Sequence, residues 1–183
     1  MTTPPPVLFF SDTTVLLNFG LAGELDALGA LLAGRGKWSG TVAHETGRQG
    51  RRHGLPELRE RSVLFLGEPV HPHDGEHRLT RERRLSFASP GDAPDEHLGE
   101  AETLTIIETR ALHAVFITDD GQVPGRTHVP CLSTWDIVRT CFRRGILTLD
   151  AAVAMHACLL QRRRVHVPEL RDPGAFVTWL TSS

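Results

Sequence analysis

Several acidic residues of this 183-residue chain directly follow apolar segments that have the pattern of β-strands. The stretch FITDDGQVPG, residues 116–125, runs an apolar segment straight into Asp119 and Asp120, and the apolar run at residues 7–10 leads into Asp12. Ligands bind at strand ends in open α/β sheets, so acids placed there are candidates for chemistry. Two adjacent carboxylates repel each other and need a cation, hydrogen bonds or water around them. The rest of the chain has to provide one of these.

Further acids lie in helical patterns. Glu45 follows Thr41, which is the expected start of one helix, and Glu100 and Glu102 open another helix that begins at residue 98. In a parallel sheet the strands at residues 7–10 and 114–118 end at the same edge, so the acids that follow them can meet. Oxygen ligands of this kind suit Mg²⁺ or Mn²⁺ rather than zinc, and Mg²⁺ sites often complete their shell with substrate phosphates. The pattern favours a divalent metal site that handles a phosphate-containing substrate.

Each acid taken alone also has a purely structural interpretation. Asp12 is a suitable helix N-cap, and acids in a first helical turn, such as Glu100 and Glu102, complement the helix dipole. Asp119 and Asp120 precede Gly121 and are typical turn residues. The joint placement of the acids, and no single one of them, favours a functional site.

Arginine dominates the basic residues. Lys37 is the single lysine, so 19 of the 20 basic residues are arginine, in a chain of net charge -2. The planar guanidinium group of arginine matches the geometry of a phosphate, which would suit a phosphate-containing partner. The alternative is that these arginines are simply solvent-exposed residues on helix faces. Arg48, Arg51 and Arg52 come shortly after Glu45, and we expect them to bind a nucleic-acid backbone.

Composition indicates one compact domain, residues 1–183, with 40% hydrophobic residues. Three cysteines lack metal-ligand spacing and even parity, so we expect them to be small core residues. The N-terminal segment lacks the features of a secretion signal, and no stretch approaches the roughly 18 apolar residues of a membrane span. These observations predict a soluble cytoplasmic protein that does not bind a membrane.

Strand and helix patterns alternate, which predicts an α/β fold with a mostly parallel sheet and helices on both faces. The expected strands are residues 7–10, 37–39, 62–66, 114–118 and 128–132, and the expected helices include 25–32, 55–61, 98–111, 134–144 and 149–164. Residues 67–97 are rich in proline, glycine and charge, and we expect a loop-rich insertion with one short helix around Arg81. Residues 146–183 form a helical C-terminal extension in this scheme.

Four motifs, in this order along the chain, resemble those of the PIN domain, the nuclease fold of VapC-type toxins and related metal-dependent ribonucleases. VLFFSDTTVLLNF resembles the family's opening strand and first acid, which nominates Asp12. TVAHETGRQ resembles the helix that carries the second acid, which nominates Glu45. LGEAETLTIIETRAL is similar to the family's GEAEAIALA-type helix; the alignment favours Glu102, with Glu100 as its stand-in.

The fourth motif of the family is a strand that ends in T-x-D or D-D, and AVFITDDGQ resembles it. The T-x-D spacing nominates Asp120 and the D-D form nominates Asp119. VPCLSTWDIVRTCFRRGIL resembles the tail of one PIN-like branch, although Trp135 and Asp136 depart from its usual glycine and small apolar residues. The resemblance covers most of the chain, but residues 67–97 are longer than the matching connection in compact relatives.

The resemblance implies a three-layer α/β/α fold and a Mg²⁺- or Mn²⁺-dependent endoribonuclease that cuts single-stranded RNA. Asp12, Glu102 and Asp120 would be direct ligands of one or two ions, which lie about 3.5 to 4 Å apart in two-metal sites. Glu45 would be a ligand or would orient a water, and Asp119 would tune the charge of the site. The resemblance further implies a toxin restrained by a small antitoxin protein, and a homodimer.

Two alternatives stay open. One is a PIN-like module that binds nucleic acid or protein without cutting. The other is an aspartate-based phosphatase in which Asp12 is phosphorylated, but such an enzyme needs a lysine late in the chain and only Lys37 is present. Separately, the stretch HPHDGEH at residues 71–77 could bind a transition metal or could simply be solvated.

Overall fold

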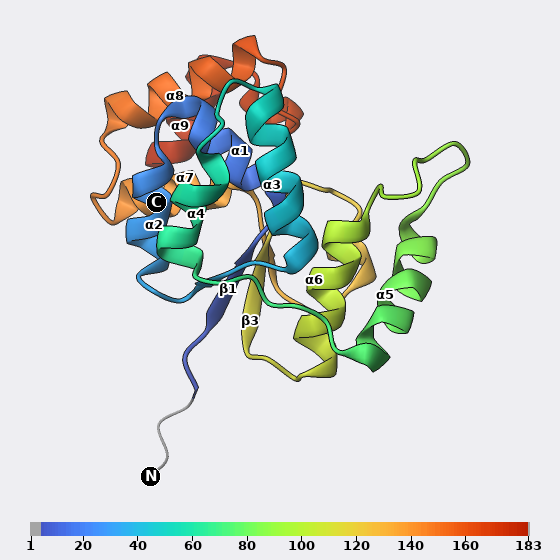
Figure 1. The fold of residues 1–183 in the computed structure, drawn as a ribbon. Helices are drawn as coiled ribbons and strands as arrows, with labels where there is room; N and C mark the ends of the chain where they lie inside the picture. The colour runs from blue at the N-terminus through green and yellow to red at the C-terminus, as the bar shows by residue number, and fades with distance from the viewer. Residues whose placement is uncertain (1–4, 183) are drawn as a thin grey trace.

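A computed structural model describes residues 5–182, and it has a four-stranded, all-parallel sheet with helices on both faces (Figure 1). The strands are β1 (Leu8–Ser11), β2 (Gly36–Lys37), β3 (Ala114–Ile117) and β4 (Cys131–Leu132), in the spatial order β2-β1-β3-β4. Leu8 pairs with Ala114 and Ser11 with Ile117. Because β1 and β3 are parallel neighbours in this register, the chain leaves both strands at the same edge.

The sheet separates two hydrophobic cores. Phe10 and Phe116 pack in a smaller core, whereas Phe9 and Ile117 pack in a larger one. Successive side chains of a strand point to opposite faces, so this division places helices on either side of the sheet. The predicted α/β class with three layers is confirmed.

Seven helices surround the larger core within residues 5–182: α1 (Thr13–Ala22), α2 (Leu25–Leu32), α3 (Gly40–Arg52), α4 (Leu58–Leu66), α7 (Thr134–Arg143), α8 (Leu149–Gln161) and α9 (Pro173–Thr181). Two helices, α5 (Asp74–Phe87) and α6 (Leu98–Thr109), cover the smaller core and pack on each other. Short 3₁₀ turns occupy Pro124–Arg126 and Pro168–Leu170. In Figure 1 the α5–α6 pair stands beside the main body, and α3 faces α6.

The prediction for residues 55–66 is wrong. We expected a short helix and then a strand at residues 62–66, but the structure has one helix, α4. Leu58, Ser62 and Leu66 are buried at intervals of four while Leu64 is 85% exposed, which is helical periodicity. The run SVLFL is too short to distinguish a strand from a helix by its apolar content alone.

Residues 67–97 contain more helix than predicted. The expected helix around Arg81 is present, but it is α5, which runs for 14 residues and is not short. Glu76 accepts the backbone N–H of His73 at 2.7 Å in the first turn and pairs with Arg110, whose Nη2 lies 2.7 Å from Oε2. Low apolar density hid the length of this helix, because its docking relies on this ion pair as well as on Phe87.

Smaller differences concern element bounds and caps. Ser39, and not Thr41, caps α3 by accepting the backbone N–H of Val42, and strands β2 and β4 are shorter than predicted. Cys141 is buried and Cys131 and Cys158 are half-buried, and all three are free. No helix in the described part of the chain combines the length and apolar content that a membrane crossing requires.

Candidate functional site

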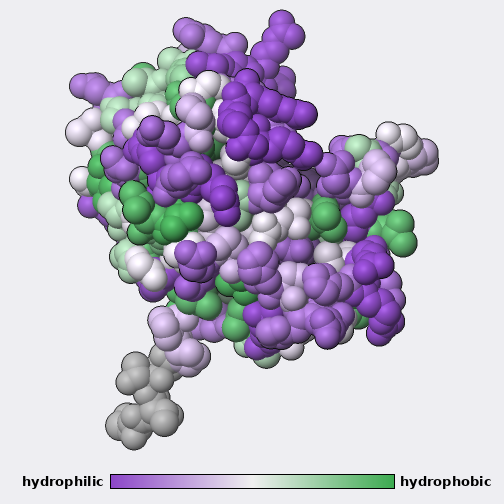
Figure 2. Space-filling view, in the orientation of Figure 1, coloured by the Kyte–Doolittle hydropathy of each residue, from purple (hydrophilic) through white to green (hydrophobic). Residues whose placement is uncertain are grey.

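A cleft of about 580 Å³ opens where β1 gives way to α1. Its walls come from the first turn of α1, from α3, and from the segment that leads into α6. In Figure 2 the surface is hollowed between α3 and that segment. The charged residues that line it are Asp12, Glu45, Arg48, Arg52, Asp95, Glu96, Glu100 and Arg164. Acids from three separate segments therefore share one cleft with three arginines.

Asp12 lies deepest among these acids, with 3% of its surface exposed. It is the N-cap of α1, and its Oδ1 accepts the Thr13 backbone N–H at 2.6 Å. Burial raises the pKa of Asp12 well above its ordinary value, and the carboxylates of Glu100 and Glu45 raise it further. A cation in the cleft would relieve this desolvation and repulsion.

Glu45 approaches Asp12 from α3. The Thr13 hydroxyl donates to Glu45 Oε2 at 3.0 Å, which holds the carboxylate against the start of α1. Burial raises the pKa of Glu45 to about 7, while the Thr13 hydrogen bond acts in the opposite direction. Gly99 on α6 makes this approach possible, since a Cβ there would lie 3.1 Å from Oε2.

Glu100, and not Glu102, completes the group around Asp12. Burial raises the pKa of Glu100, and its negative charge is among the causes that raise the pKa of Asp12. Glu102 lies roughly 200° further around α6 and accepts the backbone N–H of Thr41 at 2.8 Å and its hydroxyl at 2.9 Å. The geometry thus gives Glu102 a capping contact at the start of α3 and does not support the alignment that favoured it as a direct ligand.

Asp119 and Asp120 are neighbours in sequence with different surroundings. Asp119 accepts Asn18 Nδ2 at 2.8 Å and both the backbone N–H and the hydroxyl of Thr134, at 2.7 and 2.6 Å. It ties the end of β3 to α1 and α7, and its charge contributes to the raised pKa of Asp12. Asp120 faces the segment before α6, with Oδ2 at 3.5 Å from His97 Nδ1. Hydrogen bonds satisfy the first aspartate, and the second faces the acidic cluster.

The three arginines predicted to bind a nucleic-acid backbone, Arg48, Arg51 and Arg52, do not all lie on the same face of α3. Glu45, Arg48 and Arg52 share one face of α3 and line the cleft, whereas Arg51 does not line it. Arg48 Nη1 lies 2.9 Å from Asp95 Oδ2 across the cleft. Arg52 is exposed at the rim.

Sequence reasoning missed four residues of the site. Thr13 and Asn18 follow Asp12 on the first helix, at positions where a polar side chain in an otherwise apolar helix was the available signal. His97 precedes the helix of Glu100 and was assigned only to the end of a loop. Arg164 hydrogen-bonds Asn18 and lines both the cleft and a neighbouring pocket beside Asp119. No pattern in the sequence links Arg164 to the acids, since it comes from a segment 40 residues or more away from each of them.

Two groups of side chains within residues 5–182 have the geometry of a metal site: Asp92, Glu96 and His97, and His97, Glu100 and Asp120. Neither includes a residue of HPHDGEH, so the structure gives no support to that stretch as a metal site. The donor set around the cleft, carboxylates with one imidazole, fits Mn²⁺, and its carboxylates fit Mg²⁺.

Comparison with models of protein families, with curated proteins and with solved structures finds no match to this chain. The resemblance to PIN domains consequently rests on the motifs named above, and the assignment of function rests on the site.

Proposed function

We propose that the chain is a metal-dependent phosphodiesterase of the PIN type that cuts single-stranded RNA. The observation that carries the proposal is the convergence of Asp12, Glu45 and Glu100 in one cleft, with Asp119 and Asp120 beside it. These acids come from the end of β1, from α3, from α6 and from the end of β3, in the chain order of the resembling motifs. The preference for RNA as substrate comes from the resemblance alone.

Asp12, Glu100 and Asp120 are the residues that would hold Mg²⁺ or Mn²⁺. A bound divalent ion supplies charge stabilisation for the phosphodiester and activation of water at neutral pH. Asp119 orients the end of β3 through Asn18 and Thr134, and its charge adds to the negative potential at Asp12.

Glu45 is suited to accept a proton from an attacking water, because its pKa of about 7 matches neutral conditions. The Thr13 hydroxyl fixes which way the carboxylate points. Arg48, Arg52 and Arg164 would bind backbone phosphates on either side of the scissile bond.

The test is cleavage of a mixed single-stranded RNA pool with Mg²⁺ or Mn²⁺, beside an EDTA control and the Asp12→Asn variant. Asparagine is as good an N-cap as aspartate, so the variant keeps the start of α1 and loses the charge. We expect EDTA to abolish cleavage and the variant to slow it roughly 10²-fold or more. Cleavage that persists in Asp12→Asn would overturn the site assignment.

Glu100→Gln and Glu102→Gln form a matched pair on the same helix. We expect Glu100→Gln to lose cleavage as Asp12→Asn does. Glu102→Gln should keep cleavage and cost about 1 kcal/mol of stability through its weaker contact with Thr41. If Glu102→Gln loses cleavage and Glu100→Gln keeps it, then Glu102 is the metal ligand and Glu100 is not.

Neither alternative gains support from the site. Lys37 lies in β2 and is not among the residues that line the cleft, so a phosphatase based on Asp12 lacks its lysine. A module that binds without cutting would retain RNA in the same assay and leave it intact.

The toxin setting belongs to the same proposal. An antitoxin segment inserted near the acids would cover the cleft and block cleavage, and a homodimer would be the functional form. A neighbouring gene for a small protein with a DNA-binding N-terminus and a disordered tail would support this setting.

A further inference from the structure

His97 stands between two carboxylates at the wall of the cleft. Its Nδ1 lies 3.5 Å from Asp120 Oδ2 and its Nε2 lies 3.6 Å from Asp92 Oδ2. The side chain is 14% exposed, so the protein fixes the ring close to the acids. The proposed function gives this imidazole no task.

These separations are too long for hydrogen bonds, which join N and O at about 2.7 to 3.2 Å. They do fit atoms that bind one ion, because two ligands each about 2.1 Å from an ion lie roughly 3 to 3.5 Å apart. Ligand atoms of His97, Glu100 and Asp120 all lie within 4.8 Å of one another. The three side chains therefore surround a space of the size that a divalent ion needs.

The two ring nitrogens face different carboxylates. Nδ1 lies on the side of Asp120 and Nε2 on the side of Asp92, so the ring can present Nδ1 to an ion that Asp120 also binds. A carboxylate beside the second nitrogen of a metal-binding histidine is a frequent arrangement in metal sites.

Asp12 adds a further carboxylate to the same cleft. The residue is 97% buried and lines the cleft, and its Oδ1 accepts the Thr13 backbone N–H. Its negative charge favours a cation in the cleft, because a charge held out of bulk water is stabilised by an opposite charge nearby.

We infer that His97, Glu100 and Asp120 bind a first-row transition-metal ion, and that His97 makes the site prefer Mn²⁺ to Mg²⁺. Imidazole is a good ligand for transition metals, whereas Mg²⁺ is usually held by carboxylates, waters and phosphates. The inference rests on the proposed function in one respect, since the ion would serve the same acids. The competing explanation is that His97 is an imidazolium that only neutralises its neighbours.

The experiment compares His97→Asn with the wild type in the full chain, stripped of metal. Asparagine tolerates the left-handed backbone of this position, φ 62°, better than most residues do. His113→Asn is the control, because His113 is exposed and precedes β3, at the edge of the sheet away from the acids. Calorimetric titrations with Mn²⁺ and with Mg²⁺, and the visible absorption of bound Co²⁺, give readouts that need no RNA.

We expect His97→Asn to bind Mn²⁺ at least about tenfold more weakly than the wild type and to change the Co²⁺ spectrum. Mg²⁺ affinity should stay nearly the same, and His113→Asn should match the wild type throughout. Equal Mn²⁺ affinity and equal Co²⁺ spectra in His97→Asn and the wild type would overturn the inference and leave His97 as a counter-ion. A wild type that binds no Mn²⁺ would overturn it as well.

The two proposals fail separately. If Mn²⁺ binds tightly and the binding depends on His97, but RNA is not cut, this inference holds and the proposed function fails. If RNA is cut in a metal-dependent way and His97→Asn has unchanged metal affinity, the proposed function holds and this inference fails.

Discussion

At the scale of single residues, Asp12, Glu45 and Glu100 are held out of water next to one another. Each has a raised pKa, and burial is the largest cause in all three. Without a bound cation, their ionisation opposes folding, because the unfolded chain would solvate the same charges. Residues that lower stability in this way are typical of functional sites, where the function requires them.

Glu45 allows this to be measured. Its pKa is about 7 in the folded protein against about 4.5 when unfolded, so between these values the folded protein binds more protons than the unfolded chain. The free energy of unfolding should therefore fall as the pH rises from 5 to 8. Glutamine at this position cannot ionise. We therefore expect the decrease in the free energy of unfolding between pH 5 and pH 8 to be about 1 to 3 kcal/mol smaller in Glu45→Gln than in the wild type.

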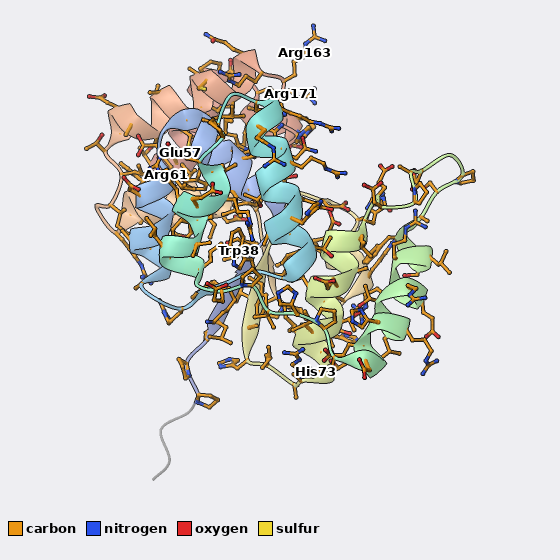
Figure 3. The ribbon with its side chains drawn as sticks, in the orientation of Figure 1. Trp38, Glu57, Arg61, His73, Arg163 and Arg171 are labelled. Atoms are coloured by element: carbon orange, nitrogen blue, oxygen red, sulfur yellow. The ribbon has the colours of Figure 1, made fainter. Side chains whose placement is uncertain are left out.

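Thermal unfolding at pH 5 and pH 8 in EDTA checks this expectation. Glu57→Gln, at the N-cap position of α4, makes the same chemical change at an exposed residue and serves as the control (Figure 3). A pH dependence that is the same in the wild type and Glu45→Gln would contradict the prediction.

At the scale of elements, the site depends on how closely α3 and α6 approach. Gly99 is the second residue of α6, and a Cβ built there would lie 3.1 Å from Glu45 Oε2 and 3.2 Å from Val42 Cγ2. Both distances are tighter than ordinary van der Waals contact, so a larger residue would displace Glu45 or separate the helices. The glycine is required by packing, since its backbone is ordinary helix.

Gly99→Ala should lower Mn²⁺ affinity and RNA cleavage several-fold while leaving the free energy of unfolding within about 1 kcal/mol, because alanine is the better helix former. Gly75→Ala is a matched control: Gly75 is the second residue of α5, and a Cβ there meets nothing within 4 Å. Metal titration and RNA cleavage of the two variants check the prediction. If both variants behave alike, the close approach of the helices does not position Glu45.

Elements that carry their own periodic signal could be predicted from sequence, and elements defined by distant contacts could not. Strand β1 and helix α7 have clear apolar patterns and adjacent capping residues, Asp12 and Ser133. Helix α5 depends on the pair between Glu76 and Arg110, which are 34 residues apart. Distant contacts also decide the site. The sequence predicts that Glu100 and Glu102 lie on one helix, but only the packing of α6 against α3 determines that Glu100 faces Asp12 and Glu102 faces Thr41.

At the scale of the whole molecule, a net charge of -2 conceals an uneven distribution. Figure 2 shows strongly hydrophilic side chains over the C-terminal half of α3 and over the neighbouring segment, where Figure 3 labels Arg163 and Arg171. Arg52 and Arg164 line the cleft there, and Arg163 lies at the same end of the molecule in Figure 3. A single-stranded polyanion could therefore follow a basic surface into the acidic cleft.

Arg52 is the residue with which to test this path, because no ion pair within the described residues engages it, whereas Arg48 is paired with Asp95. In the Asp12→Asn background, which prevents cutting, we expect Arg52→Ala to weaken RNA binding at every sequence. The slope of log affinity against log salt concentration should fall by roughly 0.7, the release of one counter-ion from a single strand. Arg61→Ala removes the same charge from α4, outside the cleft, and should leave the slope unchanged (Figure 3). Equal slopes for the two variants would mean that RNA is attracted by overall charge and does not pass along α3, and the basic rim would then have no role in binding.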